Sequence, residues 1–272
     1  MFKFFRTKLD KFKQRSTFRE YGSKLKTFQL AQDGKVEYAQ WEHPFESEKE
    51  IRQEEVNFIR NYVKEGDFVI DIGAHTGDST IPLALAAGPT GAVLALEPNK
   101  YVFKVLEKNA ALNREKTNII PKNFAASFQD GPLVFNYSDA SFCNGGDPSR
   151  IQKATHAFKL EVQAKNLAQY LEQNHADLLP KLTFFKVDAE GFDKEIVKSV
   201  KSVISQYKPT LLSECYVGLS KEERFEYFDL LTGMGYTLHR LDGLFSDKMT
   251  QLENKTNMLD KKHFDFLAVS KG

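Results

Sequence analysis

The stretch FVIDIGAHTGDST, residues 68–80, restricts the fold of this chain more than any other part of the sequence. It begins as a short apolar pattern of the kind that is buried on both faces of a parallel sheet. Gly73 and Gly77 then bracket a polar turn, and Asp78 opens a predicted helix that Gly88 ends. Strand, turn and helix in this order outline a nucleotide-binding unit.

Strand and helix patterns alternate on both sides of this unit. Helices are predicted over residues 50–64, 78–88, 99–113, 166–174, 193–206 and 221–235. Strands are predicted over residues 67–73, 91–98, 117–127, 131–138, 159–164, 182–191, 209–216, 236–241 and 263–270. The alternation predicts an α/β fold with a parallel sheet and right-handed crossovers.

Composition narrows the classes of function. The net charge of +1 argues against a dedicated nucleic-acid binder, which would be basic overall. Two cysteines are too few for a disulfide framework, which makes a reducing, cytoplasmic setting the expectation. No apolar run approaches the roughly 18 residues that span a bilayer. No paired Cys/His spacing predicts a metal site.

The first 49 residues form a predicted extension, and residues 50–272 the main domain. Residues 1–28 hold nine Lys or Arg against two acids, so this arm is strongly basic. On a helix Phe2, Phe5, Leu9 and Phe12 would share one face. We favour a helix that packs this face onto the same domain or onto a second subunit. The alternative is that the face docks on a membrane surface or on a partner.

The chemistry of the turn indicates which cofactor it holds. It lacks the G-x-G-x-x-G spacing that brings backbone close to a pyrophosphate. Asp71 and Asp78 flank the spot where a phosphate would sit, and they suit a cofactor with an ammonium and a sulfonium instead. S-adenosylmethionine has both groups and no phosphate. Glu97 ends the next strand, where an acid can accept hydrogen bonds from both ribose hydroxyls. That contact would serve NAD equally well, so Glu97 alone does not distinguish the two cofactors.

Each acid also has a purely structural interpretation. Asp71 fits a cap of the following turn, Asp78 an N-cap acid, and Glu97 a solvated strand end. Three acids at the carboxyl ends of adjacent strands are harder to explain in this way, because ligands of open α/β sheets bind there.

The motifs together resemble the FkbM family of S-adenosylmethionine-dependent methyltransferases, over about residues 50–270. The resemblance is carried, in order, by FVIDIGAHTGDST, VLALEPN, NFAAS, LTFFKVDAEGFDKEIVKSV, PTLLSEC and FDFLAVS. It implies the class I (Rossmann-like) methyltransferase fold, a seven-stranded sheet with an antiparallel last strand. The cofactor residues that it implies are Asp71, Gly73, Ala74, Gly77, Glu97, Phe124 and Ala125. His75 stands where the family has asparagine, and it can hydrogen-bond from there.

Three carboxylates are candidates for catalysis. Asp188 ends a strand predicted beside the first, and we expect it to act as general base or to orient the acceptor. Glu190 is its nearest rival and Glu214 the third candidate. The alternatives are that Asp188 neutralises Lys186 or receives the cofactor ammonium, that Glu190 caps the next helix, and that Glu214 bonds a neighbouring loop.

The sequence therefore predicts an S-adenosylmethionine-dependent methyltransferase. The resemblance implies O-methylation of a sugar, glycan or related natural product as small-molecule or glycan acceptor. The loop over residues 138–150, with Ser141, Asn144 and Arg150, falls where such an enzyme places its acceptor, although an ordinary surface loop has the same composition. The alternatives are an NAD-dependent oxidoreductase and a non-catalytic binding module. Self-association through the basic arm also stays open.

Overall fold

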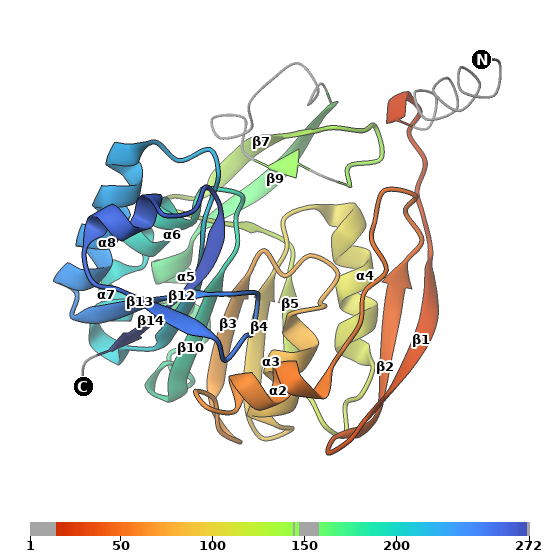
Figure 1. The fold of residues 1–272 in the computed structure, drawn as a ribbon. Helices are drawn as coiled ribbons and strands as arrows, with labels where there is room; N and C mark the ends of the chain where they lie inside the picture. Colours follow the sequence, from red (N-terminus) through yellow and green to blue (C-terminus); the bar gives the residue numbers. More distant parts are fainter. Residues whose placement is uncertain (1–14, 144, 147–157, 271–272) are drawn as a thin grey trace, which may run out of the picture.

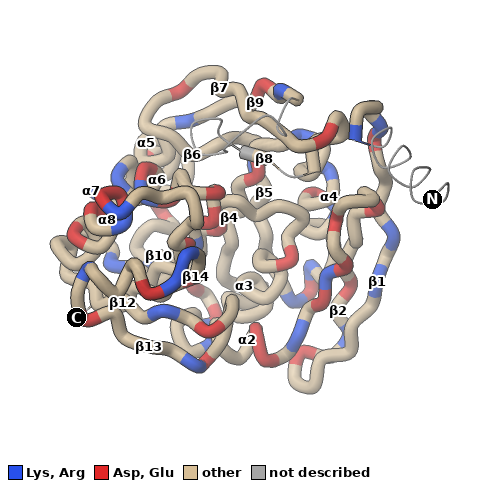
Figure 2. The backbone as a smooth tube through the Cα atoms, turned by 45° about the horizontal axis from the view of Figure 1, so that its top comes forward, with Lys and Arg blue, Asp and Glu red and all other residues tan. Residues whose placement is uncertain are grey.

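The computed structural model describes residues 15–143, 145–146 and 158–270 (Figure 1). The predicted helical face of Phe2, Phe5, Leu9 and Phe12 lies outside the described residues, as do Asn144 and Arg150. No helix of the described ranges is long and apolar enough to cross a membrane. Basic and acidic residues are interspersed along the described chain (Figure 2).

The main sheet has eight strands within the described residues, in the order β13-β12-β14-β11-β10-β3-β4-β5. They are β3 (Phe68–Ile72), β4 (Ala92–Leu96), β5 (Ile119–Lys122), β10 (Leu182–Val187), β11 (Thr210–Cys215), β12 (Tyr236–Leu241), β13 (Met249–Leu252) and β14 (Phe264–Ser270). Strands β3, β4, β5, β10 and β11 are parallel, and the last strand β14 is antiparallel to its neighbours, as predicted. Seven strands were predicted, and the described sheet has one more, the edge strand β13.

Helices cover both faces of this sheet, as expected. They are α2 (Gln53–Ile59), α3 (Thr80–Ala87), α4 (Lys100–Ala111), α5 (Leu167–Asn174), α6 (Asp193–Ser199), α7 (Lys201–Tyr207) and α8 (Lys221–Gly233), with short 3-10 helices at Leu179–Lys181 and Lys255–Leu259. Alternate residues of β3 face opposite layers: Phe68 and Ile70 pack with α5 to α8, and Val69 packs with α2 and α3. Burial on both faces explains the continuous apolar pattern of the central strands.

Three predicted elements differ from the structure. The strand predicted over residues 117–127 is two strands, β5 and β6 (Ala125–Ser127), which belong to different sheets. The helix predicted over residues 193–206 is interrupted at Val200, whose φ of −112° and ψ of 21° are not helical. Helix α2 is shorter than the pattern over residues 50–64.

A second sheet lies above the carboxyl ends of the main strands (Figure 1). It has the order β6-β9-β7-β8, with β7 at Gly131–Tyr137, β8 at Gly145–Gly146 and β9 at Phe158–Asn166. Strands β7 and β9 form its long antiparallel pair. This sheet places side chains of β7 over the edge of the main sheet where ligands of α/β folds bind.

The segment before α2 forms a hairpin of β1 (Ser23–Leu30) and β2 (Gly34–Trp41). Val36 and Tyr38 pack with residues of α3, and Trp41 packs with residues of α4. The side chain of Asn109 in α4 accepts a bond from Ala39 N (2.6 Å) and donates to Ala39 O (3.1 Å), which satisfies the outer edge of β2. Part of the predicted extension is therefore packed onto the main domain.

Candidate active site

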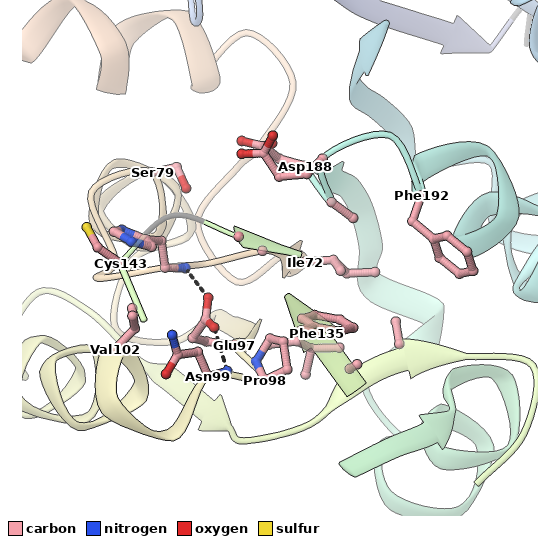
Figure 3. Close-up of a pocket in the computed structure, with 18 of the residues that line it drawn as sticks. Ile72, Ser79, Glu97, Pro98, Asn99, Val102, Phe135, Cys143, Asp188 and Phe192 are labelled. Carbon is pink, nitrogen blue, oxygen red and sulfur yellow. Dashed lines mark hydrogen bonds between the residues drawn. The ribbon is translucent and has the colours of Figure 1, made fainter. Parts of the chain in front are cut away.

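A cavity of about 390 Å³ opens at the carboxyl ends of β3, β4 and β10 (Figure 3). Its walls come from the turn after β3, the ends of β4 and β10, the segment after β5, strand β7, and residues 45–49. Its size is that of a pocket for a cofactor or other small molecule. The figure shows Glu97 and Asp188 on different sides of this space.

The glycine turn after β3 is held between two neighbouring strands. Gly73 N and Ala74 N both donate to Leu96 O at the end of β4, at 3.1 and 3.0 Å. On the other side, a Cβ atom on Gly73 would lie 1.9 Å from Asp188 O, and the φ of Gly73 is +73°. Only glycine fits here, because a side chain would meet backbone and strain the conformation. The turn is thus fixed at the floor of the cavity.

Glu97 is a buried acceptor at the end of β4. Its Oε2 accepts a bond from His75 N (3.0 Å) and its Oε1 one from Asn99 N (2.7 Å). Burial raises the pKa of Glu97, and the neighbouring His75 and these backbone donors oppose that rise. A carboxylate held in this way keeps lone pairs for hydroxyl groups of a ligand in the cavity.

Asp71 lies beneath the turn and not in the wall of the cavity. Its Oδ2 accepts bonds from Ser79 Oγ (3.1 Å) and Thr80 Oγ1 (2.7 Å), and its Oδ1 lies 3.1 Å from Lys186 Nζ. Burial favours a neutral Lys186, but Asp71 and Asp188 outweigh it and raise the pKa of Lys186. Asp71 therefore ties the start of α3 to β10.

Asp78 lines the cavity and is paired with a lysine as well. Its Oδ2 lies 2.9 Å from Lys49 Nζ. Burial would raise the pKa of Asp78, yet Lys49 and then His75 lower it below its usual value. Each of the two acids of the turn thus has a lysine that balances its charge. The expectation that Asp71 and Asp78 would repel a phosphate of the cofactor therefore cannot rest on these two acids alone.

Asp188 and Glu190 lie in the loop between β10 and α6, and both line the cavity. The side chain of Asp188 is 46% exposed, and its Oδ2 is 3.7 Å from Lys186 Nζ, so the predicted pairing with Lys186 is present. The alternative that Glu190 caps α6 is wrong, since the N-cap residue is Phe192 and no side chain there accepts a capping bond. Loss of hydration and the charge of Asp188 raise the pKa of Glu190.

Glu214 lies at the end of β11, behind the wall of the cavity. Its Oε1 is 3.2 Å from Nε2 of His263, in the loop before β14, which matches the predicted contact with a neighbouring loop. Burial, and after it Asp188 and the other nearby carboxylates, raises the pKa of Glu214 to about 9.

The cavity brings together most of the residues predicted from sequence: Gly73, His75, Asp78, Glu97, Phe124, Ala125, Asp188 and Glu190. Asp71, Ala74, Gly77 and Glu214 do not line it. Sequence reasoning missed the wall formed by Phe45, Glu46, Ser47 and Lys49, because no motif marks this segment.

The charge of the cavity is predominantly negative. Its described lining contains five carboxylates (Glu46, Asp78, Glu97, Asp188 and Glu190) against two lysines and His75. Apolar side chains of the segment after β5 and of β7 complete the lining, among them Phe124 and Phe135. Such a site favours a cationic ligand with an apolar, flat portion. Within the described ranges, no group of three or more His, Cys, Asp or Glu is arranged to hold a metal ion.

Comparison with known proteins gives a family match. The model of the methyltransferase FkbM domain matches residues 71–240. Methyltransferase sdnD of Sordaria araneosa is 24% identical over 175 residues, which cover 56% of this chain and 67% of that protein. Demethylmenaquinone methyltransferase of Lactobacillus johnsonii is 33% identical over 85 residues, 31% of this chain and 32% of that protein.

Solved structures with a similar fold have low sequence identity. Methyltransferase FkbM from Methylobacillus flagellatus KT is 15% identical, with a TM-score of 0.45. The alignment covers 76% of this chain and 44% of that one, so this chain spans less than half of the solved protein.

Proposed function

The chain belongs to the FkbM family of methyltransferases, and we propose that it transfers a methyl group from S-adenosylmethionine to a hydroxyl of a sugar, glycan or related natural product. The observation that carries this proposal is the acid-rich cavity at the carboxyl ends of β3, β4 and β10, with Glu97 and Asp188 in its walls.

The residues of the cavity fit S-adenosylmethionine. Glu97 would accept hydrogen bonds from the ribose hydroxyls, because two backbone donors already fix its carboxylate. The apolar surface of Phe124, Ala125 and Phe135 suits the adenine base. The excess of carboxylates favours the ammonium and sulfonium groups. When bound, this cofactor supplies a methyl group that the sulfonium makes electrophilic.

Asp188 is the residue that we assign to the acceptor. Its exposed carboxylate lies in the cavity wall, where it would hold the acceptor hydroxyl and remove its proton as the methyl group is transferred. Lys186 and the backbone bond from Asp188 N to Ile72 O (3.1 Å) orient it. Glu190 remains the rival, because burial and the charge of Asp188 raise its pKa and so favour its binding a proton.

Aromatic side chains line much of the remaining wall. Phe45, Phe135, Tyr137 and Phe192 contribute apolar surface that would displace water from the reacting groups. Holding the acceptor atom in line with the methyl group in such a site provides much of the rate of a displacement reaction.

Calorimetric titration with S-adenosylhomocysteine, with NADH as control, tests the cofactor. Micromolar binding of the first and none of the second is the expected result. Binding of NADH alone would support the oxidoreductase, and binding of neither would support a non-catalytic scaffold. Incubation with labelled S-adenosylmethionine and matched hydroxyl and amine acceptors then tests the acceptor. Label found only on amines would contradict O-methylation.

A further inference from the structure

One wall of the cavity comes from residues 45–49, which precede the matched family region and are called the N-terminal wall below. Two buried side chains fix its backbone. Gln40 donates to Ser47 O (3.1 Å) and accepts from Lys49 N (2.8 Å). His43 accepts from Phe45 N (3.1 Å), and its Nε2 lies 3.3 Å from Asp139 Oδ1. The wall is therefore a preformed part of the site.

Lys49 extends from this wall to the glycine turn. Its Nζ lies 2.9 Å from Asp78 Oδ2 and 3.3 Å from Glu46 Oε1, and its side chain is 23% exposed in the lining of the cavity. Burial alone would lower the pKa of Lys49, but Asp78 and Glu46 raise it, so the amine stays charged at neutral pH. An ammonium has three N–H donors, and two carboxylates leave one for a ligand.

The other lysine in the described lining has no such capacity. Lys186 is 3% exposed, and three acceptors surround its Nζ: Asp71 Oδ1 at 3.1 Å, Gly73 O at 3.5 Å and Asp188 Oδ2 at 3.7 Å. Among the described lining residues, Lys49 is thus the lysine that retains a donor toward the cavity.

The position of Lys49 matches one end of the proposed cofactor. Glu97 contacts the glycine turn at His75 N, whereas Lys49 contacts it at Asp78, at the far end of the turn before α3. A ligand whose ribose lies at Glu97 and whose chain follows the turn would bring its other end to Lys49. In S-adenosylmethionine that end is an amino acid, with an ammonium and a carboxylate.

We propose that Lys49 binds the carboxylate of the amino-acid portion of the methyl donor. This inference rests on the proposed function. The surrounding carboxylates would attract the donor's ammonium but repel its carboxylate, so a site of this charge needs a cation for that group. Lys49 supplies it from a segment that lies outside the region shared with the family.

Two ligands separate this role from a general effect on the site. S-adenosylhomocysteine contains the amino-acid portion, and 5′-methylthioadenosine has the same adenosine and a thioether but lacks it. We would titrate both by calorimetry into the wild type, Lys49→Met, Lys49→Arg and a control variant, Lys35→Met, whose lysine pairs with Glu37 on the exposed hairpin. Thermal unfolding of each variant would be recorded alongside.

Lys49→Met is expected to weaken S-adenosylhomocysteine binding by about tenfold or more, as loss of a charged hydrogen bond does. Binding of 5′-methylthioadenosine should change by less than about twofold, which lies within the scatter of such contacts. Lys49→Arg should recover most of the affinity, and Lys35→Met should bind both ligands as the wild type does.

Two results would overturn the inference. Equal weakening of both ligands in Lys49→Met would leave Lys49 only a structural role, and unchanged affinity for S-adenosylhomocysteine would leave it none. Failure of the proposed function gives a different result, because the wild type would then bind neither ligand.

Discussion

Two regions next to the cavity, called the turn side and the loop side, differ in how their charged groups are paired. On the turn side, each acid has a lysine: Asp71 lies 3.1 Å from Lys186, and Asp78 lies 2.9 Å from Lys49. The loop side lies at the carboxyl ends of β10 and β11 and the start of β14. It holds Glu190, Glu214 and Asp265, and the pKa of each is raised by burial and by Asp188. His263, whose Nε2 lies 3.2 Å from Glu214 Oε1, is the partner of Glu214 there.

The two sides therefore suit different functions. Paired charges at short distance keep a fixed ionisation state and geometry, which suits the binding of a cofactor. Carboxylates with raised pKa values bind a proton more readily than ordinary ones, which suits acid–base chemistry. Asp188 lies between the two sides, since it is near Lys186 of the turn side and raises the pKa of the loop-side acids. We therefore propose that the turn side binds the cofactor and that the loop side provides the acid–base chemistry.

Gly73→Ala tests the close contact between the turn side and the loop after β10. In Gly73→Ala the new Cβ would meet Asp188 O, and the positive φ would add strain, at a cost of about 3 kcal/mol or more. Thermal unfolding and S-adenosylhomocysteine binding should both be impaired. Gly233→Ala, where no atom lies within 4 Å of the new Cβ, is the control and should change stability by about 1 kcal/mol at most. Wild-type behaviour of Gly73→Ala would show that the turn is not confined by β10.

Asp188→Asn separates chemistry from binding. Turnover with the acceptor found by screening should fall by about 100- to 10,000-fold, since the amide cannot accept the proton. Affinity for S-adenosylhomocysteine should change only a few-fold, because the side chain keeps its shape. Glu190→Gln is the matched comparison. A larger loss of turnover there would transfer the role to Glu190, and unchanged turnover in Asp188→Asn would remove Asp188 from the mechanism.

Asp71→Asn tests the pairing of charges on the turn side. The variant leaves Lys186 buried with Asp188, 3.7 Å away, as its remaining carboxylate, so unfolding free energy should fall by about 3–5 kcal/mol. Asp229→Asn removes the partner of Lys255 on the surface and should cost less than about 1 kcal/mol. Chemical denaturation measures both. If the two variants lost the same small amount, the buried pair would not stabilise the turn.

Glu214→Gln tests the raised pKa of Glu214 on the loop side. The pKa of Glu214 is raised from 4.5 to about 9, so the folded state holds a proton that the unfolded state releases between these values. Stability from this group is therefore present at low pH and declines as pH rises toward 9, by at most about 1.4 kcal/mol per pH unit. Glutamine does not titrate, so the variant's melting temperature should decline less between pH 6 and 9. Parallel curves for the two proteins would contradict the raised pKa.

The core strands could be predicted from sequence because burial on both faces leaves a continuous apolar pattern, as in β3 and β4. Strand β13 left no such pattern, since three of its four residues are exposed at the sheet edge. The hairpin of β1 and β2 did leave a signal, Asp33-Gly34 between alternating segments, which the prediction did not use.

The site was predictable where it follows from the order of strands. Glu97 and Asp188 end strands on either side of β3, so the fold alone brings them together. Lys49 was not predictable, because its contact with Asp78 depends on how the N-terminal wall packs after β2. The compensation of Asp71 by Lys186 depends on the register of β10 against β3, which sets these two residues opposite each other.

The order of strands in the main sheet also has a consequence for how the chain folds during synthesis. Strand β3 lies between β4, which follows it closely, and β10, whose Lys186 is 115 residues beyond Asp71. Until the ribosome has made β10, one edge of β3 has no partner and Asp71 has no cation. Such distant pairing slows folding and exposes intermediates to aggregation. We therefore expect the first half of the chain to stay unfolded or bound to a chaperone until its second half emerges.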